Sequence, residues 1–244
     1  MAGWILTDEV KNLDLSSKSF DQFLEFFFNR EVLPDEKQFD YYLTDLDGER
    51  YDEAVPSSPT IVVEHMTKLF AHFGHTAPKY SLAQLDQGIW GILGENLRLY
   101  ELLWDSSVPV DQRVQCIRSM FSVYSDFVSK SKAEVMVGCF DMWWDLILYG
   151  FWFQRKLFDL NIKMGDVSKL DEESRLLLDI MFETLTKILG LSDARTQGYA
   201  LHGLGHLHHP AVRETVQVFI DNHKTELTKQ GLRWIEQCRD GTAM

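Results

Sequence analysis

Histidines near the C-terminal end of the chain are the residues whose spacing could support metal chemistry. His202 and His206 are four residues apart in a stretch with helical periodicity, so both side chains are expected on one helix face, as two zinc ligands would be. The stretch HGLGH lacks the glutamate that HExxH metalloproteases use as a general base, and the sequence offers no obvious third ligand. The simpler interpretation is that these imidazoles, with those of His208 and His209, bond free carbonyl groups at a helix end and turn. A metal-dependent hydrolase that uses His202, His206 and a distant carboxylate is the alternative.

Two aspartates form a second group that could do chemistry. Asp141 and Asp145 are four residues apart in an apolar stretch, and two tryptophans lie between them. A carboxylate pair can do acid–base work when burial separates the two pKa values, whereas a structural pair accepts hydrogen bonds from tryptophan, arginine or a helix terminus. A third interpretation is a concave recognition patch, since tryptophan is a frequent anchor of binding surfaces. The candidate partner-binding residues are Trp143, Trp144, Asp141, Asp145, His202 and His206.

No catalytic residue, native metal site or cofactor is assigned from the sequence. The chain contains no GxSxG nucleophile motif, no GxxxxGK[ST] phosphate loop and no GxGxxG motif after a strand. The glycines at 88, 91 and 94 are spaced three apart on a predicted helix, which favours close helix packing over phosphate binding.

The histidines belong to a segment, residues 196–223, that predicts two helices joined by a tight turn. Pro210 cannot continue the first helix, because it has no backbone N–H and its ring clashes with the preceding turn. Glycines in the first helix would let a neighbouring helix approach closely. They are Gly198, Gly203 and Gly205.

This segment contains the pattern A-L-x-x-L-G-x-L-x-x-P-x-V. Its fixed positions are Ala200, Leu201, Leu204, Gly205, Leu207, Pro210 and Val212. The pattern resembles a HEAT-like repeat of the kind named after the phycobilisome lyases. Many such repeats carry Asp before the proline, and this chain has His209 there. The resemblance implies an α-solenoid that presents a surface to a partner.

Helical periodicity covers most of the remaining chain. Ser19 with Gln22 and Ser81 with Gln84 form predicted capping boxes, and Asp171 is a candidate N-cap. Apart from a short helix around Trp4, helices are predicted over residues 19–30, 60–74, 81–94, 95–104, 111–130, 135–153, 171–189 and 227–238. The helix over 111–130 carries two apolar stripes, which is typical of a helix covered on two sides.

We therefore predict an all-α fold, an α-solenoid-like array of antiparallel helix pairs. Residues 1–244 are expected to form a single helical domain, in which 1–59 are less regular and contain an acidic loop, and 60–244 form stacked hairpins. The apolar run over 135–153 is marginal in length for a membrane span. Each of its two aspartates would cost roughly 2.5–3.5 kcal/mol at a bilayer centre, so a buried helix is predicted instead.

The charge of the chain bounds its partners. It has 37 acidic against 24 Lys and Arg residues among 244, a net charge of -13. This field repels phosphate backbones and favours basic partners, and no cluster of Lys and Arg indicates nucleic-acid binding. The three cysteines are widely separated and are predicted to be buried free thiols. The N-terminus has acidic residues and no basic region, so it does not read as a signal peptide, and the cytoplasm is the expected compartment.

Together these features favour a non-catalytic, bacterial-type HEAT-like protein whose acidic surface binds another protein. A basic partner is expected, with neither nucleic acid nor membrane. An immunity protein that neutralises a basic toxin domain, or a regulatory binder, would suit the charge by analogy.

Overall fold

The computed structural model is mostly helical over the residues that it describes, which are 11–34, 41–94, 97–131, 137–154 and 167–243. The α-helices are α1 (Phe20–Phe28), α2 (Pro59–Ala71), α3 (Phe73–Thr76), α4 (Leu82–Leu93), α5 (Val110–Asp126), α6 (Val137–Asp141), α7 (Trp143–Gln154), α8 (Glu172–Leu189), α9 (Ala194–Leu207), α10 (Val212–His223) and α11 (Lys229–Asp240). Two short strands, β1 (Asn12–Leu13) and β2 (Glu53–Ala54), pair in parallel. The all-α prediction is confirmed for these residues.

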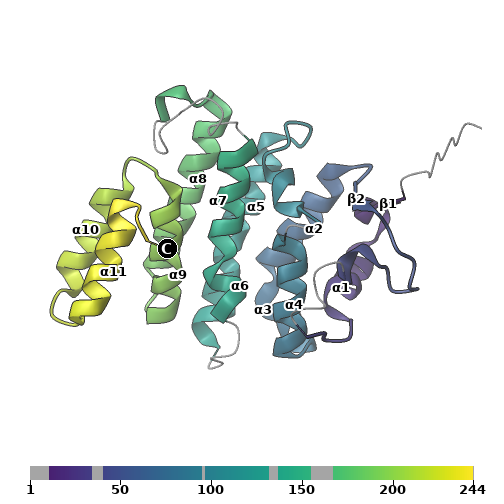
Figure 1. The fold of residues 1–244 in the computed structure, drawn as a ribbon, viewed down its shortest axis with the longest axis horizontal. Coiled ribbons are helices and arrows are strands. Elements are labelled where there is room, and N and C mark those ends of the chain that lie inside the picture. The colour runs from purple at the N-terminus through teal and green to yellow at the C-terminus, as the bar shows by residue number, and fades with distance from the viewer. Residues whose placement is uncertain (1–10, 35–40, 95–96, 132–136, 155–166, 244) are drawn as a thin grey trace, which may run out of the picture.

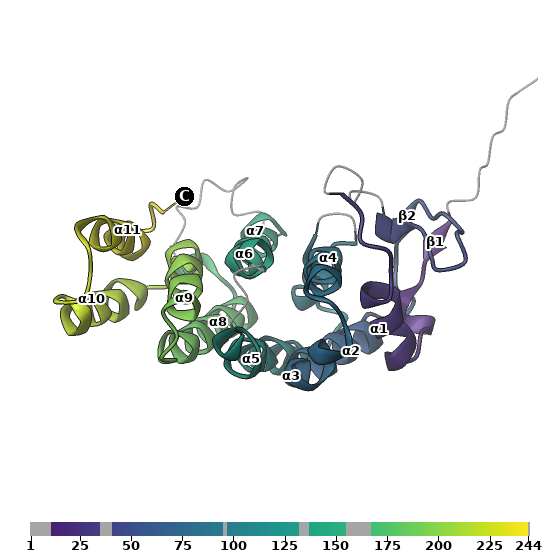
Figure 2. The same cartoon turned by 90° about the horizontal axis from the view of Figure 1, so that it is seen from below.

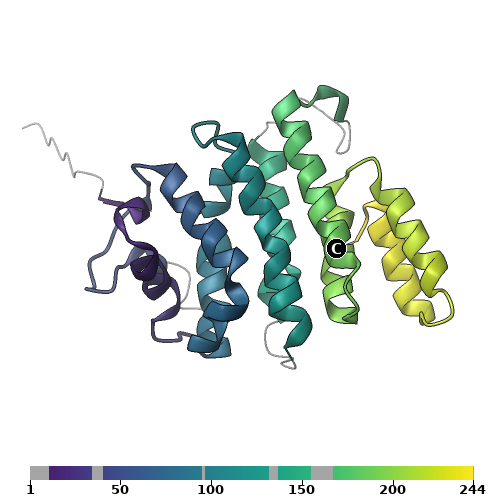
Figure 3. The same cartoon turned by 180° about the vertical axis from the view of Figure 1, so that it is seen from behind.

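The helices are arranged in two rows. Figure 1 faces the row that contains α4, α7 and α9, and Figure 3, from behind, faces the row that contains α2, α5 and α8. In the row of α2, α5 and α8, the middle helix α5 contacts both of the others. In the row of α4, α7 and α9, helix α7 contacts α4 and α9, and α9 also contacts α11. Figure 2 shows the α2–α5–α8 row bowed away from the other row. Buried apolar side chains from Leu13 to Ala243 form one continuous cluster between the elements.

Helix α5 shows why a double apolar stripe predicts this position. Ile117 and Tyr124 of one stripe and Cys116 and Met120 of the other are all fully buried. Helix α5 packs against both α2 and α8. The prediction that this helix is covered on two sides is confirmed.

Polar caps fix several helix starts where the sequence places them. Capping boxes begin α1 at Ser19 and α4 at Ser81, and the Asp171 side chain accepts a hydrogen bond at the start of α8. The region predicted as a helix over 95–104 instead contains a short 3-10 helix, η5 (Leu99–Leu103), preceded by Arg98 in the left-handed conformation. Left-handed backbone cannot continue an α-helix, which explains the difference.

The apolar run over 135–153 is the clearest departure from the predicted elements. It was expected as one buried helix, but α6 ends at Asp141 and α7 begins at Trp143, with a bend at Met142 between them. Neither proline nor an N-cap sequence marks this position, so periodicity alone gives no sign of the break. Within the described residues, no helix is both long enough and apolar enough to span a bilayer.

The less regular N-terminal part is held together by a buried guanidinium group. Arg30 donates from Nε to the carbonyl of Phe26 at 2.6 Å, from Nη1 to that of Tyr41 at 3.1 Å and from Nη2 to that of Thr44 at 2.6 Å. This side chain therefore ties the end of α1 to the loop that follows. The short helix predicted around Trp4 lies outside the described residues.

The three cysteines lie within the described residues, are buried and form no disulfide bond, as predicted. Burial raises the pKa of the Cys116 and Cys238 thiols to about 12. A thiol with such a pKa stays protonated near neutral pH, so these cysteines act as small core residues.

Candidate metal centre

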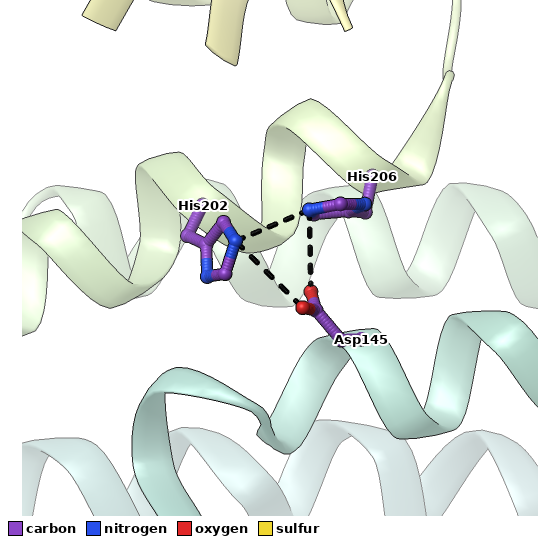
Figure 4. Close-up of side chains that lie close together, drawn as sticks. All are labelled: Asp145, His202 and His206. Carbon is purple, nitrogen blue, oxygen red and sulfur yellow. Dashed lines mark hydrogen bonds and ion pairs between the residues drawn. The ribbon is translucent and has the colours of Figure 1, made fainter. Parts of the chain in front are cut away.

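Three side chains from neighbouring helices point toward one another, as Figure 4 shows. Asp145 lies in the first turn of α7, and His202 and His206 lie one turn apart on α9. The Nε2 atoms of the two histidines are 3.1 Å apart. Oδ2 of Asp145 lies 3.7 Å from Nε2 of His202, and Oδ1 of Asp145 lies 3.6 Å from Nε2 of His206. We call these three residues the His2Asp cluster. One candidate ligand atom of each lies within 4.8 Å of the other two.

The His202 ring is oriented by Asp141, the last residue of α6. Its Nδ1 lies 3.2 Å from the Asp141 carboxylate oxygen Oδ1 and 3.3 Å from the Asp141 main-chain carbonyl oxygen. Both neighbours can only accept, so the proton is on Nδ1 and is donated to them. The hydrogen bond to Asp141 raises the pKa of His202, while burial acts in the opposite direction. In the neutral ring, the lone pair of Nε2 then faces the cluster.

Burial acts on the other two members in opposite directions. It lowers the pKa of His206, and it raises the pKa of Asp145 against the attraction of the two imidazoles. The Asp145 side chain is only 17% exposed, and among the described residues its Oδ1 has no hydrogen-bond partner. A buried, unbonded carboxylate oxygen costs free energy. Oδ1 lies 3.6 Å from His206 Nε2, while the lone pair of His202 Nε2 faces the other oxygen, Oδ2, at 3.7 Å. A cation between the three groups would bond the oxygen that accepts no hydrogen bond from the described residues.

The separations fit a first-row transition-metal ion. Zinc binds histidine nitrogen and carboxylate oxygen at roughly 2.0–2.2 Å, so two ligand atoms on a tetrahedral ion are about 3.4 Å apart. The two Nε2 atoms are 3.1 Å apart, and each lies near a different oxygen of Asp145: Oδ1 is 3.6 Å from His206 Nε2 and Oδ2 is 3.7 Å from His202 Nε2. These distances are within a few tenths of an ångström of the expected value, and both carboxylate oxygens face the space between the imidazoles. Two imidazoles and one carboxylate also suit iron and related ions, whereas Ca²⁺ and Mg²⁺ prefer oxygen ligands.

Local features of α9 set the position of its two histidines. The Asp193 side chain caps the helix by accepting from the Thr196 N–H at 2.9 Å. Helices α7 and α9 approach closely at Gly203, where an added Cβ would lie 2.8 Å from the Cβ of Trp144. Gly205 likewise faces the backbone of Cys238 in α11, whereas Gly198 has nothing within 4 Å of such a Cβ. The predicted role of glycine in close helix approach is therefore confirmed at two of the three positions.

The two predicted groups of candidate residues meet in space. Asp145, the second aspartate of the pair, is a candidate third ligand that the sequence did not identify, and Asp141 contacts the other side of the His202 ring. Both pairs have i, i+4 spacing, which places the two histidines on one face of α9. The break at Met142 instead puts Asp141 at the end of α6 and Asp145 in the first turn of α7. The spacing was a usable sign of grouped residues, but it could not show that the aspartates lie opposite the histidines.

The two tryptophans are not where a binding surface needs them. Trp143 and Trp144 are both 0% exposed. Trp143 donates from Nε1 to the Met120 sulfur at 3.3 Å, and its ring packs edge-on against Phe70. Large apolar rings gain more from the core than from water, so a surface partner cannot contact them. This corrects the prediction that they anchor a recognition patch.

His208 and His209, which follow α9, lie outside the cluster. His208 ends α9 in the left-handed conformation. His209 stacks on Phe182 and lies 3.0 Å from the Asp179 carboxylate. Four histidines in eight residues therefore divide into two candidate ligands and two residues of the turn.

Comparison with known proteins adds no relative. No family model matches the chain, and no curated protein or solved structure matches it either.

Proposed function

We propose that this protein binds a divalent transition-metal ion through Asp145, His202 and His206. The observation that carries the proposal is the convergence of two imidazole nitrogens on the Asp145 carboxylate, whose buried Oδ1 accepts no hydrogen bond from a described residue. An ion at this point would bond all three groups at once. It would also link α7 to α9, because one ligand comes from the first helix and two from the second.

The same proposal includes a HEAT-like, α-solenoid type of array as the scaffold. Its support is the alternation of consecutive long helices between the two rows, with α2, α5 and α8 in one and α4, α7 and α9 in the other (Figure 2). The repeat-like pattern from Ala200 to Val212 covers the helix that holds both histidines. A scaffold of this kind would hold the ligands on two rigid neighbouring helices.

Elemental analysis of the purified full-length protein tests metal binding. Stoichiometric zinc, iron, manganese or cobalt is expected, and it should be lost in Asp145→Asn and in His206→Gln. After chelation, calorimetric titration with Zn²⁺ and Co²⁺ should show binding in the wild type and in neither of these two variants. His209→Gln is the matched control. His209 follows α9, close in sequence to the two candidate ligands, but it pairs with Asp179 of α8 and lies outside the cluster.

Two results would contradict the proposal. One is a wild-type protein that binds none of these ions after chelation. The other is a His209→Gln variant that loses binding as fully as His206→Gln, because the effect would then belong to the hairpin and not to the cluster.

A metal-dependent hydrolase is the catalytic form of this proposal. The His206 side chain is 31% exposed, so solvent reaches the edge of the cluster. A catalytic zinc ion lowers the pKa of its bound water to about 7, and the hydroxide that forms is a nucleophile. Hydrolysis of activated esters and phosphate esters by the metal-loaded wild type, absent in Asp145→Asn, would support catalysis. No turnover in either protein would favour a non-catalytic role for the ion.

A second candidate function is the binding of a basic protein partner, as an immunity-type or regulatory protein of the cytoplasm. Residues 1–59 hold 14 acidic against 5 basic residues, so this part carries -9 of the net charge of -13. Several exposed apolar side chains accompany these acids; they are Val32, Leu46, Val55 and Ile61. The combination favours a partner at the N-terminal end of the array, remote in sequence from the His2Asp cluster.

A further inference from the structure

His202 has a carboxylate at each of its ring nitrogens. Asp141 Oδ1 lies 3.2 Å from Nδ1, and Asp145 Oδ2 lies 3.7 Å from Nε2. Only Nε2 belongs to the His2Asp cluster. Asp141 therefore contacts the cluster through the histidine and not through the ion.

We propose that Asp141 is a positioning residue, which holds His202 in the tautomer and the orientation that a metal ion needs. This inference rests on the proposed metal function. A metal ligand must present a lone pair, and a proton kept on Nδ1 leaves that lone pair on Nε2. A carboxylate on the opposite nitrogen also makes the ligand more basic, as in the carboxylate–histidine–zinc arrangement.

The break between α6 and α7 makes Asp141 suited to this role. Asp141 is the last residue of α6, so its main-chain carbonyl belongs to the helix end, where no further turn of α6 supplies an N–H. That carbonyl lies 3.3 Å from the same Nδ1 that the carboxylate contacts. One residue thus supplies two acceptors to one N–H group, while Asp145, in the first turn of α7, is left to face Nε2.

Zinc affinity, measured by competition with a chromophoric chelator, tests the role of Asp141. Asp141→Ala is expected to weaken binding by about 10- to 100-fold. Asp141→Asn keeps an acceptor but loses the charge, so its affinity should lie between those of the wild type and Asp141→Ala. Asp179→Ala is the control, because it removes one negative charge from another aspartate–histidine pair, at 3.0 Å, and should bind as the wild type does.

Nitrogen-15 spectra of the zinc-loaded protein provide a readout that a purely structural role would not change. In the wild type and in Asp141→Asn, His202 should show a hydrogen-bonded Nδ1–H and a metal-bound Nε2. In Asp141→Ala the hydrogen-bonded Nδ1–H should weaken or exchange faster. Asp141 has a side chain that is 43% exposed, so both variants are expected to fold, and circular dichroism would verify this.

The outcomes separate this inference from the proposed function. A wild type that binds zinc together with an Asp141→Ala variant of equal affinity would overturn the positioning role and leave the metal site intact. Equal weakening by Asp179→Ala would assign the effect to net charge and would also overturn it. A wild type that binds no metal would end the proposed function itself. If Asp141→Ala does not fold, a wild-type spectrum in Asp141→Asn together with an affinity moderately below that of the wild type supports the hydrogen bond. Loss of the hydrogen-bonded Nδ1–H signal with an unchanged affinity contradicts it.

Discussion

Arg30 and Asp145 both place polar atoms in the interior, but they differ in how many hydrogen-bond partners those atoms have. Every nitrogen of the Arg30 guanidinium group donates to a main-chain carbonyl, and the Phe26 ring lies 4.3 Å from the guanidinium carbon. The Oδ1 of Asp145 has no hydrogen bond from any described residue. A buried group with all its partners contributes to the fold, whereas an unpaired one needs an explanation such as a bound ion. This contrast is why we assign a structural role to the first and a ligand role to the second.

Arg30→Lys should lower the free energy of unfolding by roughly 2 kcal/mol or more, because the ammonium group cannot reach three carbonyls at once and at least one is left unpaired. Chemical denaturation measures the change. Arg118→Lys is the control, since Arg118 pairs with Glu183 where both side chains are about half exposed, and a change within about 0.5 kcal/mol is expected. Equal losses in the two variants would show that Arg30 has no special structural role.

At the scale of elements, α9 supplies two of the three candidate ligands and must lie close to α7. The approach depends on Gly203, because a side chain there would collide with the Cβ of Trp144 and with Leu185. The start of the helix depends on the Asp193 cap. Both features act on the backbone, yet both set the distance between Asp145 and His202.

Gly203→Ala is expected to destabilise the protein by about 1–3 kcal/mol, the usual cost of overpacking. It should also weaken zinc binding, because α7 and α9 must separate to admit the methyl group. Gly198→Ala, on the same helix with open space at its Cβ, should stabilise by up to about 1 kcal/mol through helix propensity and leave zinc binding unchanged. Thermal unfolding with and without zinc compares the pair, and a tolerated Gly203→Ala would contradict the close approach.

The cap of α9 predicts a pH-dependent contribution to stability. Burial alone would raise the pKa of Asp193, but hydrogen bonds from Thr196 together with the nearby Arg195 guanidinium group outweigh it and hold the pKa below its ordinary value of 3.8. A depressed pKa means that the stabilisation is present above this value and is lost as the pH falls through the pKa of the folded state. Asp193→Ala should cost about 1 kcal/mol at neutral pH, and less in acid. Asp193→Asn should keep the cap but remove this pH dependence, and denaturant titrations across acidic pH would measure it.

At the scale of the whole molecule, the net negative charge is concentrated in the N-terminal part, whereas the helices are not. The helices extend along the full array, but most of the net charge belongs to residues 1–59. An uneven field of this kind steers an oppositely charged partner toward one end. It also predicts that the partner surface and the His2Asp cluster can be altered separately.

Association with a basic partner, once one is identified by pull-down, should slow steeply as salt is added, because exposed charges are screened beyond about 10 Å at 0.1 M salt. Neutralising two exposed acids of the N-terminal part, in Asp21→Asn/Glu25→Gln, should lower the association rate and its salt dependence. Glu172→Gln/Glu183→Gln removes the same charge from exposed positions of α8 and should have a smaller effect. Rapid-mixing kinetics would measure both, and a salt-insensitive rate would contradict a role for charge.

Much of the fold was predictable because helices are encoded by nearby residues. The two capping boxes, the Asp171 cap and the double stripe of α5 are all local patterns, and the structure confirms each of them. The HEAT-like array is a proposal about how those helices stack, which no local pattern fixes. The break at Met142 escaped prediction because it lies within a mostly apolar run that contains no proline and no capping sequence.

The sequence by itself determined most of the helices, several of their caps and the position of His202 and His206 on one helix face, because spacing along a helix follows from its geometry. It also placed Asp141 and Asp145 four residues apart, as a second candidate pair. Only the tertiary structure decided that the two pairs face each other, that Asp145 and not Asp141 belongs to the candidate ligand set, and that the two tryptophans are core residues. These outcomes depend on which helix packs against which, and about sixty residues of chain separate the partners. Contacts over that distance come from the packing of the whole array, and no stretch of sequence contains them.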